Sequence, residues 1–311
     1  MNFPFQLQRG REFDVVGFGT NAVDFLIRVP AYPAFNSKVE LTDYIQAAGG
    51  EIATSMVSLQ RLGLKTCYVG RFGDDASGDF GIQTLRDEGV DVSLSEQITG
   101  ATTQIAFILI DVSNGERTVI WKRDSKLAFR PDEAPVNLMA GTSAVHITPH
   151  DTQACIVLAR EAKKHGTILS MDLDNLFDGI EELLPMMDIT ITSADLPKRL
   201  FGIDNKRDSL KAMRGKYGAS IVGITLGEDG SMLLCGDEFI ETPGFAVPNG
   251  CKDTTGAGDS FRAGLLYGLI KGRSVSESAR MANAVAALKC RDIGARTALP
   301  TYAELQALLA A

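Results

Sequence analysis

Short apolar, β-branched runs alternate with stretches of helical periodicity along most of the chain. Six of these runs are typical of buried strands in a parallel sheet, at residues 13–18, 66–70, 143–147, 167–171, 188–192 and 220–225. Helical periodicity between them predicts helices over residues 50–62, 76–88, 152–165 and 206–217. The alternation predicts βαβ crossovers and therefore an α/β fold with a doubly wound, mainly parallel sheet.

Two stretches depart from this alternation. Residues 23–45 contain β-branched runs interrupted by Pro30 and Pro33, and residues 90–121 are strand-like with a hairpin signal at Asn114-Gly115. We expect the two stretches to pair into a small antiparallel sheet that covers the main sheet as a lid. The chain is thus predicted to be one domain, 1–311, with lid insertions at about 24–46 and 92–122. Its last third, 256–309, is expected to be almost wholly helical.

Charge and cysteine content narrow the class of protein. Lys and Arg number 31 against 39 Asp and Glu, a net charge of −8, which argues against a nucleic-acid or anionic-membrane partner. The five cysteines form no C-x-x-C pair, so neither a zinc cluster nor a redox dithiol is expected. No secretory signal and no apolar run approaching the roughly 18 residues of a membrane span is present, and a cytoplasmic location is expected.

The strongest motif is Asp-Thr-Thr-Gly-Ala-Gly-Asp-Ser-Phe at 253–261, directly before a helical stretch. Glycines ahead of a helix let backbone N–H groups converge, and the helix dipole adds partial positive charge, which together make an anion site. Asp259 falls in the first helical turn, where a carboxylate is a favourable cap. The same position would let it accept a hydroxyl proton as a general base. Spacing alone leaves both interpretations open.

This motif resembles the C-terminal signature of the ribokinase-like (PfkB-type) carbohydrate kinases. Similar segments extend from about residue 13 to 300: Gly49-Gly50 before a helix, the Gly-x-x-Gly-x-Asp segment at 70–75, Thr-x-Gly-x-x-Gly at 225–230, and the helix at 282–288. The resemblance implies a three-layer fold with a β-sheet lid, ATP and Mg²⁺ as cofactors, and Asp259 as the catalytic base. It also implies an anion hole formed by Gly256, Ala257 and Gly258.

The resemblance further assigns two groups of binding residues. Contacts to the sugar are implied for Asn21, Asp24, Gly49, Gly50 and Thr54, and contacts to the nucleotide for Ser193, Thr225, Gly227, Gly230, Thr255, Gly258 and Asn283. Thr54 stands where the family usually has Asn. A turn cap at Asn21 and a surface carboxylate at Asp24 are the alternatives to sugar recognition.

Other positions depart from the family pattern or leave choices open. Residues 193–196 read Ser-Ala-Asp-Leu in place of the family's Asn-x-x-Glu, so Mg²⁺ would be held through phosphate and water, or by Asp195. Arg123 lies in a segment similar to those of ketohexokinases and 2-keto-3-deoxygluconate kinases, and it is either a contact to an acidic substrate group or a solvated strand end. Arg262 could point away from the site or neutralise phosphate.

The remaining polar candidates are at strand ends. Asp172 and Asp174 follow a predicted strand, where open α/β sheets bind ligands, and could be phosphate-side or structural acids. The spacing of His146 and His150 gives no helical metal motif, because Pro149 lies between them, so no protein metal site is predicted. The Gly-x-Gly-x-x-Ala segment at 17–22 is not followed by a helical pattern, which argues against a dinucleotide-binding dehydrogenase. The sequence also contains no P-loop motif.

These observations predict an ATP-dependent kinase that phosphorylates a hydroxyl group of a small carbohydrate. A nucleoside kinase of the same superfamily and a non-catalytic sugar- or nucleotide-binding relative remain as alternatives. The resemblance leaves open a monovalent cation such as K⁺ and a homodimer formed through the lid.

Overall fold

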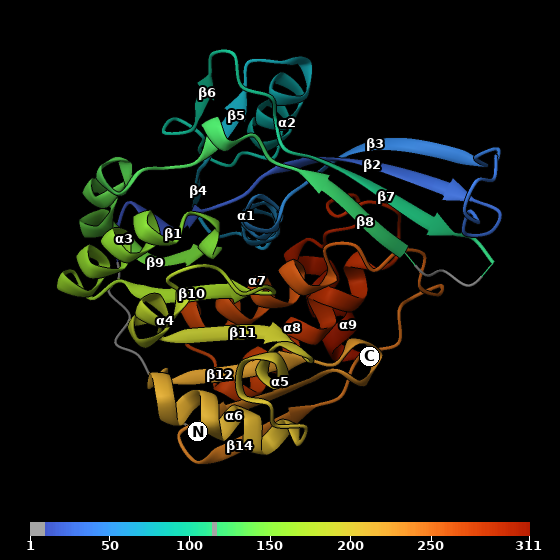
Figure 1. The fold of residues 1–311 in the computed structure, drawn as a ribbon. Helices are drawn as coiled ribbons and strands as arrows, with labels where there is room; N and C mark the ends of the chain where they lie inside the picture. The colour runs from blue at the N-terminus through green and yellow to red at the C-terminus, as the bar shows by residue number, and fades with distance from the viewer. Residues whose placement is uncertain (1–9, 114–116) are drawn as a thin grey trace.

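The computed structural model describes residues 10–113 and 117–311 and has an eight-stranded sheet at its centre (Figure 1). The strand order is β14-β13-β12-β11-β10-β9-β1-β4, parallel from β4 to β12 and antiparallel for the last two strands. The strands are β1 (Phe13–Phe18), β4 (Thr66–Val69), β9 (Thr142–Ile147), β10 (Ile168–Leu173), β11 (Ile189–Ser193), β12 (Ile221–Thr225), β13 (Ser231–Cys235) and β14 (Glu238–Thr242). The predicted α/β class and mainly parallel sheet are confirmed.

Helices cover both faces of this sheet, which explains why the central strands β9 and β10 are buried at every position (Figure 1). One face carries α1 (Glu51–Arg61), α7 (Ala257–Ile270), α8 (Val275–Lys289) and α9 (Tyr302–Ala310). The other carries α3 (Thr152–Lys164), α4 (Ile180–Leu183), α5 (Leu196–Phe201) and α6 (Lys206–Tyr217). Successive β1 side chains point to opposite faces, so Val15 packs into the core beside α1 and Val16 into the core beside α3. The chain therefore forms three layers.

A second sheet, which we call the lid sheet, projects beyond one end of the main sheet (Figure 1). Its order is β3-β2-β7-β8, with β2 (Ala22–Val29), β3 (Asp43–Gly49), β7 (Ile105–Asp111) and β8 (Arg117–Lys122). The pairs β2–β3 and β7–β8 are antiparallel as expected, but β2 and β7 pair in parallel. The wholly antiparallel prediction was wrong because both hairpins leave the core in the same direction. The turn predicted at Asn114-Gly115 lies outside the described residues.

Other elements were absent from the prediction or differ from it. Helix α2 (Ala76–Asp87) matches the periodicity, whereas the short pair β5 (Arg71–Gly73) and β6 (Glu96–Ile98) and the β13–β14 hairpin have no counterpart in it. The predicted helical segment, 256–309, contains three helices, but a non-helical segment, 290–301, separates α8 from α9. No helix within the described ranges is long and apolar enough to cross a membrane.

Candidate active site

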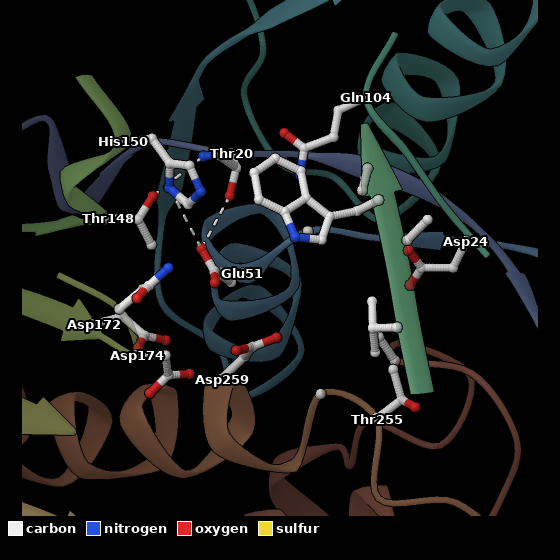
Figure 2. A pocket seen from close by; sticks show the side chains of 18 of the residues that line it. Thr20, Asp24, Glu51, Gln104, Thr148, His150, Asp172, Asp174, Thr255 and Asp259 are labelled. Carbon is white, nitrogen blue, oxygen red and sulfur yellow. Dashed lines mark hydrogen bonds and ion pairs between the residues drawn. The ribbon is translucent and has the colours of Figure 1, made fainter. Parts of the chain in front are cut away.

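A cavity of about 490 Å³ lies between the lid sheet and the carboxyl ends of the main parallel strands (Figure 2). We call it the lid cavity. The lid sheet and the segment before β7 supply Ala22, Asp24, Gln104, Ala106, Ile108, Arg117, Val119 and Trp121 to its wall. The opposite wall includes Thr20, Gly50, Glu51, Thr148, His150, Asp172, Asp174, Thr255, Gly256 and Asp259. Ligands of open α/β sheets bind at this edge, so the lid cavity is the natural place for a substrate.

The N-terminus of α7 forms one end of the lid cavity. Gly256 is the residue before the helix and has φ +79°, a conformation that favours glycine. The first turn of a helix leaves N–H groups without acceptors inside the helix, and its dipole attracts negative charge. The Ala257 N–H instead donates to the Thr254 carbonyl at 3.1 Å, so within the first turn the N–H groups of Gly258 and Asp259 remain for the anion site that the sequence predicts.

Asp259 is partly exposed at the floor of the lid cavity, directly below Glu51 in Figure 2. Burial raises its pKa to about 8, and the negative charge of Glu51 acts in the same direction. Asp24 enters the cavity from β2, and burial raises its pKa to about 6 against the opposing charge of Arg296. A carboxyl group with a raised pKa in a cleft is suited to proton transfer near neutral pH.

Three further acids line the wall opposite the lid sheet. Arg262 is buried beneath them and pairs at 2.7 Å with both Asp172 and Asp174. Glu51 accepts a hydrogen bond from Thr20 at 3.1 Å, and burial with the charge of Asp174 raises its pKa to about 7. The structure thus places Arg262 as the counter-ion of the two aspartates. Glu51 is not among the residues predicted from the sequence, although its position directly after Gly49-Gly50 could have indicated it.

Four predicted substrate contacts do not line the lid cavity. The Asn21 side-chain amide donates to the Tyr68 hydroxyl and to the Arg71 carbonyl, both at 2.9 Å. Thr54 is fully buried in α1, within 3.4 Å of the Arg296 guanidinium. Gly49 also lies outside the lining, and its carbonyl accepts a hydrogen bond from Arg296.

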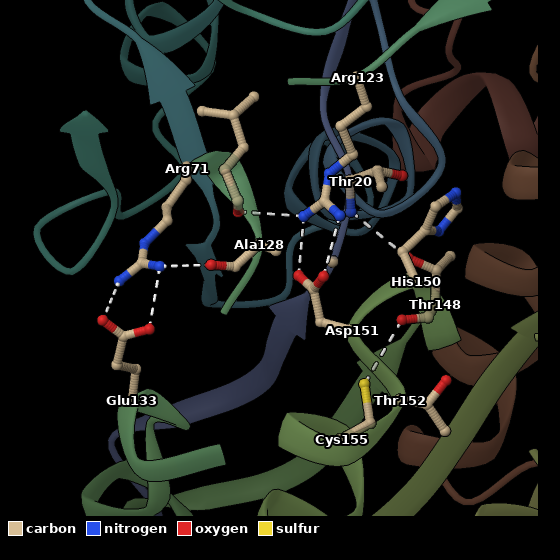
Figure 3. A network of polar contacts seen from close by, with 12 residues as sticks. Thr20, Arg71, Arg123, Ala128, Glu133, Thr148, His150, Asp151, Thr152 and Cys155 are labelled. Carbon is tan, nitrogen blue, oxygen red and sulfur yellow. Dashed lines mark hydrogen bonds and ion pairs between the residues drawn. The ribbon is translucent and has the colours of Figure 1, made fainter. Parts of the chain in front are cut away.

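The fourth is Arg123, at the base of the lid sheet. It forms a two-pronged ion pair with Asp151 at 2.7 and 2.9 Å and donates to the Leu127 carbonyl (Figure 3). Its guanidinium is partly buried in this pairing and does not reach the lid cavity. The prediction of a solvated strand end was therefore wrong, and the predicted contact to an acidic substrate group has no support from the position of Arg123 outside the cavity wall.

A second cavity of about 790 Å³, the α8 cavity, lies on the other side of the α7 N-terminus. Its wall contains Gly227, Glu228, Asp229, Gly244, Phe245, Ala246, Val247, Gly250, Cys251, Thr254, Ala257, Asn283, Ala286, Ala287 and Cys290. Since Thr255 and Gly256 line the lid cavity while Thr254 and Ala257 line this one, the two cavities meet at the start of α7.

The predicted nucleotide residues divide between several places. Gly227 and Asn283 line the α8 cavity, and the Asn283 amide donates to the Ser231 hydroxyl at 3.1 Å and the Thr242 carbonyl at 3.3 Å. Thr255 lines the lid cavity instead. The remaining residues, Ser193, Thr225, Gly230 and Gly258, line neither cavity.

The structure also shows the surroundings of Ser193, Asp195 and His146. The Ser193 hydroxyl donates to Asp195 at 2.9 Å, and Asp195 is exposed outside the lid cavity. His146 is a packed histidine, fully buried with its Nδ1 at 3.0 Å from the Ser170 hydroxyl. Within residues 10–113 and 117–311, no three His, Cys, Asp or Glu side chains form a ready metal cluster.

Comparison with known proteins gives consistent matches along the chain. The model of the pfkB family carbohydrate kinases matches residues 13–302. Fructokinase-1 of Zea mays is 30% identical over 325 residues, 96% of this chain and 98% of that protein. An ATP-dependent 6-phosphofructokinase of Thermoanaerobacterium thermosaccharolyticum is 28% identical over 93% of this chain and 92% of that protein. The structure of Arabidopsis thaliana ribokinase complexed with ribose and ATP has the same fold, with a TM-score of 0.84, 24% identity and coverage of 96% of this chain and 98% of that one.

Proposed function

This chain belongs to the pfkB family of carbohydrate kinases, and from that premise we propose that it transfers the γ-phosphate of ATP to one hydroxyl group of a small neutral sugar. The observation that carries the proposal is the position of Asp259, at the floor of a cavity and at the N-terminus of a helix. A base and an anion site that share one helical turn are what in-line phosphoryl transfer to an alcohol requires.

In the proposed reaction Asp259 accepts the proton of the attacking hydroxyl group. The backbone N–H groups of Gly258 and Asp259 donate to the negative charge that develops on the phosphoryl oxygens, which stabilises the transition state without a rearrangement of the loop. Asp24 accepts hydrogen bonds from other sugar hydroxyls and fixes which of them faces Asp259. The lid sheet limits access of water, which would otherwise compete as acceptor.

The α8 cavity is proposed as the place of the adenine and ribose of ATP, with the phosphates directed along the α7 N-terminus into the lid cavity. Its position supports this assignment, because the cavities meet at residues 254–257. The Arabidopsis thaliana ribokinase, which has the same fold, is a complex with ribose and ATP, so this fold can hold a sugar and a nucleotide together.

Mg²⁺ fits the residues present, although its ligands differ from those that the resemblance implies. Glu51 and Asp174 offer hard oxygen donors on the cavity wall, and Mg²⁺ typically uses one or two carboxylates together with waters and substrate phosphates. We propose that these two residues hold it. Bound there, it supplies positive charge that offsets the negative charge of the phosphates.

The charge of the lid cavity favours a neutral sugar over an acidic one. Five carboxyl groups line it, from Asp24, Glu51, Asp172, Asp174 and Asp259. The cationic side chains on its wall are Arg117 and Arg199, at its periphery, and Arg117 donates to the Thr254 hydroxyl while Arg199 donates to Asn175 at 2.9 Å. Because Arg123 is paired with Asp151, an acidic substrate loses the counter-ion that the sequence offered.

The test is Asp259→Asn, assayed by ADP release with a panel of neutral ketoses, aldoses, acid sugars and nucleosides. The wild-type enzyme is expected to turn over a neutral sugar, and the variant to lose at least about 10³-fold in kcat with little change in the KM of that sugar. Turnover of the folded variant near the wild-type rate would refute the assigned base. Preference for a nucleoside would favour the nucleoside-kinase alternative, and ATP binding without turnover of any compound would favour a non-catalytic relative.

Exposed apolar side chains on the outer face of the lid sheet support a homodimer of this protein. Phe25 and Phe107 stack there with ring centroids 5.3 Å apart, and Phe107, Tyr44 and Ile120 are 39%, 61% and 54% exposed. An apolar face of this kind on a projecting sheet marks an interaction site. We propose that a second copy of the chain covers it. Sedimentation of the wild type as a dimer and of Phe107→Asp as a monomer would support this, and a monomeric wild type would exclude it.

A further inference from the structure

A lysine side chain is fully buried behind the anion site. Lys289 is the last residue of α8 and has 0% exposed surface. Its Nζ donates to the backbone carbonyl of Asp253 at 2.8 Å and lies 3.8 Å from a carboxylate oxygen of the same residue. A buried cation without compensation is very costly, so a lysine at such a place needs a specific partner. The mechanism proposed above gives Lys289 no role.

Asp253 is the residue that organises the segment before α7. One carboxylate oxygen accepts hydrogen bonds from the N–H and hydroxyl groups of Thr255, at 2.9 and 2.8 Å. The other accepts the N–H of Gly294 at 2.8 Å. The Asp253 side chain therefore joins two loops, the one that leads into the anion site and the one that follows α8.

The second of these loops also contacts two segments that border the lid cavity. Ala295 lies against Gly256 so closely that a Cβ on Gly256 would be 2.9 Å from the Ala295 Cβ and its carbonyl oxygen. Arg296, the next residue, donates to the Gly49 carbonyl. A displacement of Asp253 would thus shift the α7 N-terminus on one side and the backbone before α1 on the other.

The positive charge of the Lys289 ammonium compensates the buried negative charge of the Asp253 carboxylate. Asp253 is 7% exposed, and its carboxylate and carbonyl both face the interior. The C-terminus of α8 favours a cation at its last residue. Burial lowers the pKa of Lys289, and the Asp253 carboxylate opposes that shift.

We propose that the Lys289 ammonium is a positioning residue for phosphoryl transfer, a built-in cation that fixes the Asp253 loop and thereby the anion site at the start of α7. This inference rests on the kinase function proposed above and deepens it. It also decides the question of a monovalent cation such as K⁺. Because the ammonium already occupies the Asp253 carbonyl, the wild-type enzyme has no need of such an ion at this loop.

Two substitutions distinguish the effect of the Lys289 charge from the effect of the volume of its side chain. Lys289→Met removes the ammonium and keeps the cavity filled, whereas Lys289→Ala leaves room for a small cation. The matched control is Lys252→Met, which removes an exposed lysine near the same loop. Each is assayed for kcat and for the KM of sugar and ATP in KCl, NH₄Cl and choline chloride of equal ionic strength.

Lys289→Met is expected to lose about 10–100-fold in kcat in all three salts, the range typical of residues that orient a site from behind, with the sugar KM nearly unchanged. Lys289→Ala is expected to lose as much in choline chloride and to recover at least threefold in NH₄Cl or KCl. The wild type and Lys252→Met are expected to be insensitive to the choice of cation. A wild type activated by K⁺, an Lys289→Met variant with normal kcat, or an Lys289→Ala variant with no cation-specific recovery would each overturn the proposal.

Thermal unfolding gives a readout that needs no turnover. K⁺ or ammonium should raise the melting temperature of Lys289→Ala relative to choline and leave that of the wild type unchanged; an equal response in both proteins would contradict the proposal. If the Ala variant does not fold, Lys289→Gln keeps a donor of similar length, and an unchanged kcat there would refute the need for charge. A wild type inactive with every sugar would refute the proposed function itself, whereas failure of the Lys289 tests in an active kinase would refute only this inference.

Discussion

The lid sheet and the loop that leads into α7 face each other across one cavity, yet they are built in opposite ways. The lid contributes side chains, among them Asp24 and Trp121, and its edge strand β8 is exposed along its whole described length. The 253–256 loop leads into the first turn of α7, where the backbone N–H groups of Gly258 and Asp259 lie, and hydrogen bonds of the buried residues Asp253 and Lys289 fix this loop from behind. We infer that the lid determines which acceptor binds and the loop determines whether phosphoryl transfer occurs.

The difference has a physical basis in what each part must recognise. Sugars differ in the direction of their hydroxyl groups, and side chains on a sheet can be exchanged to match them without a change of fold. A phosphoryl group is the same for every acceptor, and backbone N–H groups held by a helix are suited to it. The comparison therefore predicts changes in KM from the lid and changes in kcat from the loop.

After Asp259→Asn, the largest effect is expected from Gly256→Ala. This residue has φ +79°, and an added Cβ would also collide with Ala295 at 2.9 Å. We expect a loss of about 100-fold in kcat and roughly 2 kcal/mol in the free energy of unfolding, since the left-handed conformation costs about 1–2 kcal/mol by itself. Steady-state kinetics and urea unfolding measure the two. Gly218→Ala is the matched control, with φ +78° and open space around it, and should lose stability without losing kcat.

Asp24→Asn tests the lid side. The amide keeps the size of the side chain but lacks the negative charge that strengthens hydrogen bonds from sugar hydroxyls, a loss of about 1.5–2 kcal/mol or some 10- to 30-fold in KM. We expect the KM of the sugar to rise by that factor while the KM of ATP stays within twofold. Asp195→Asn, an exposed residue outside the cavity, serves as control. An equal rise in both KM values would contradict the division between lid and loop.

The smallest effect concerns the free energy of unfolding and tests the α7 side of the cavity. Because the pKa of Asp259 is raised from 3.8 to about 8, the folded state keeps a proton that the unfolded chain has lost between those values, so this residue makes stability fall as pH rises. The Asn side chain of Asp259→Asn does not titrate, so the variant lacks this decrease in stability with rising pH. We expect the variant to exceed the wild type by about 1 kcal/mol at pH 8.5 and to equal it near pH 4, measured by urea unfolding. A variant less stable than the wild type at pH 8.5 would show that Asp259 supports the fold.

Much of the main sheet follows directly from the order of residues. Mainly apolar runs such as Phe13–Phe18 predict strands because a strand between two helical layers has no face toward solvent. The β13–β14 hairpin was missed because its outer strand alternates between exposed and buried positions, Glu238 among the exposed, and a short amphipathic strand gives a weak signal.

The site was harder to predict, since several side chains are occupied by partners far away in sequence. Arg123 binds Asp151, 28 residues later, and Arg262 binds Asp172, 90 residues earlier. No local pattern records such pairings, because only the fold decides which opposite charges meet. Lys289 could have been noticed as a lysine on an otherwise apolar helical face, but its partner is a backbone carbonyl, which no side-chain pattern reveals.

The parallel pairing of β2 with β7 has a consequence for the order of folding. Val23 pairs with Ile105, so the connection between them includes α1, β4 and α2 and must be closed before the lid sheet can form. Closing a loop of that length has an entropic cost that is recovered only when the intervening core has assembled. We therefore expect the lid sheet to fold late and to be the first part to open when native-state hydrogen exchange samples partial unfolding. The protein can thus expose its acceptor cavity by a local transition while the main sheet stays intact.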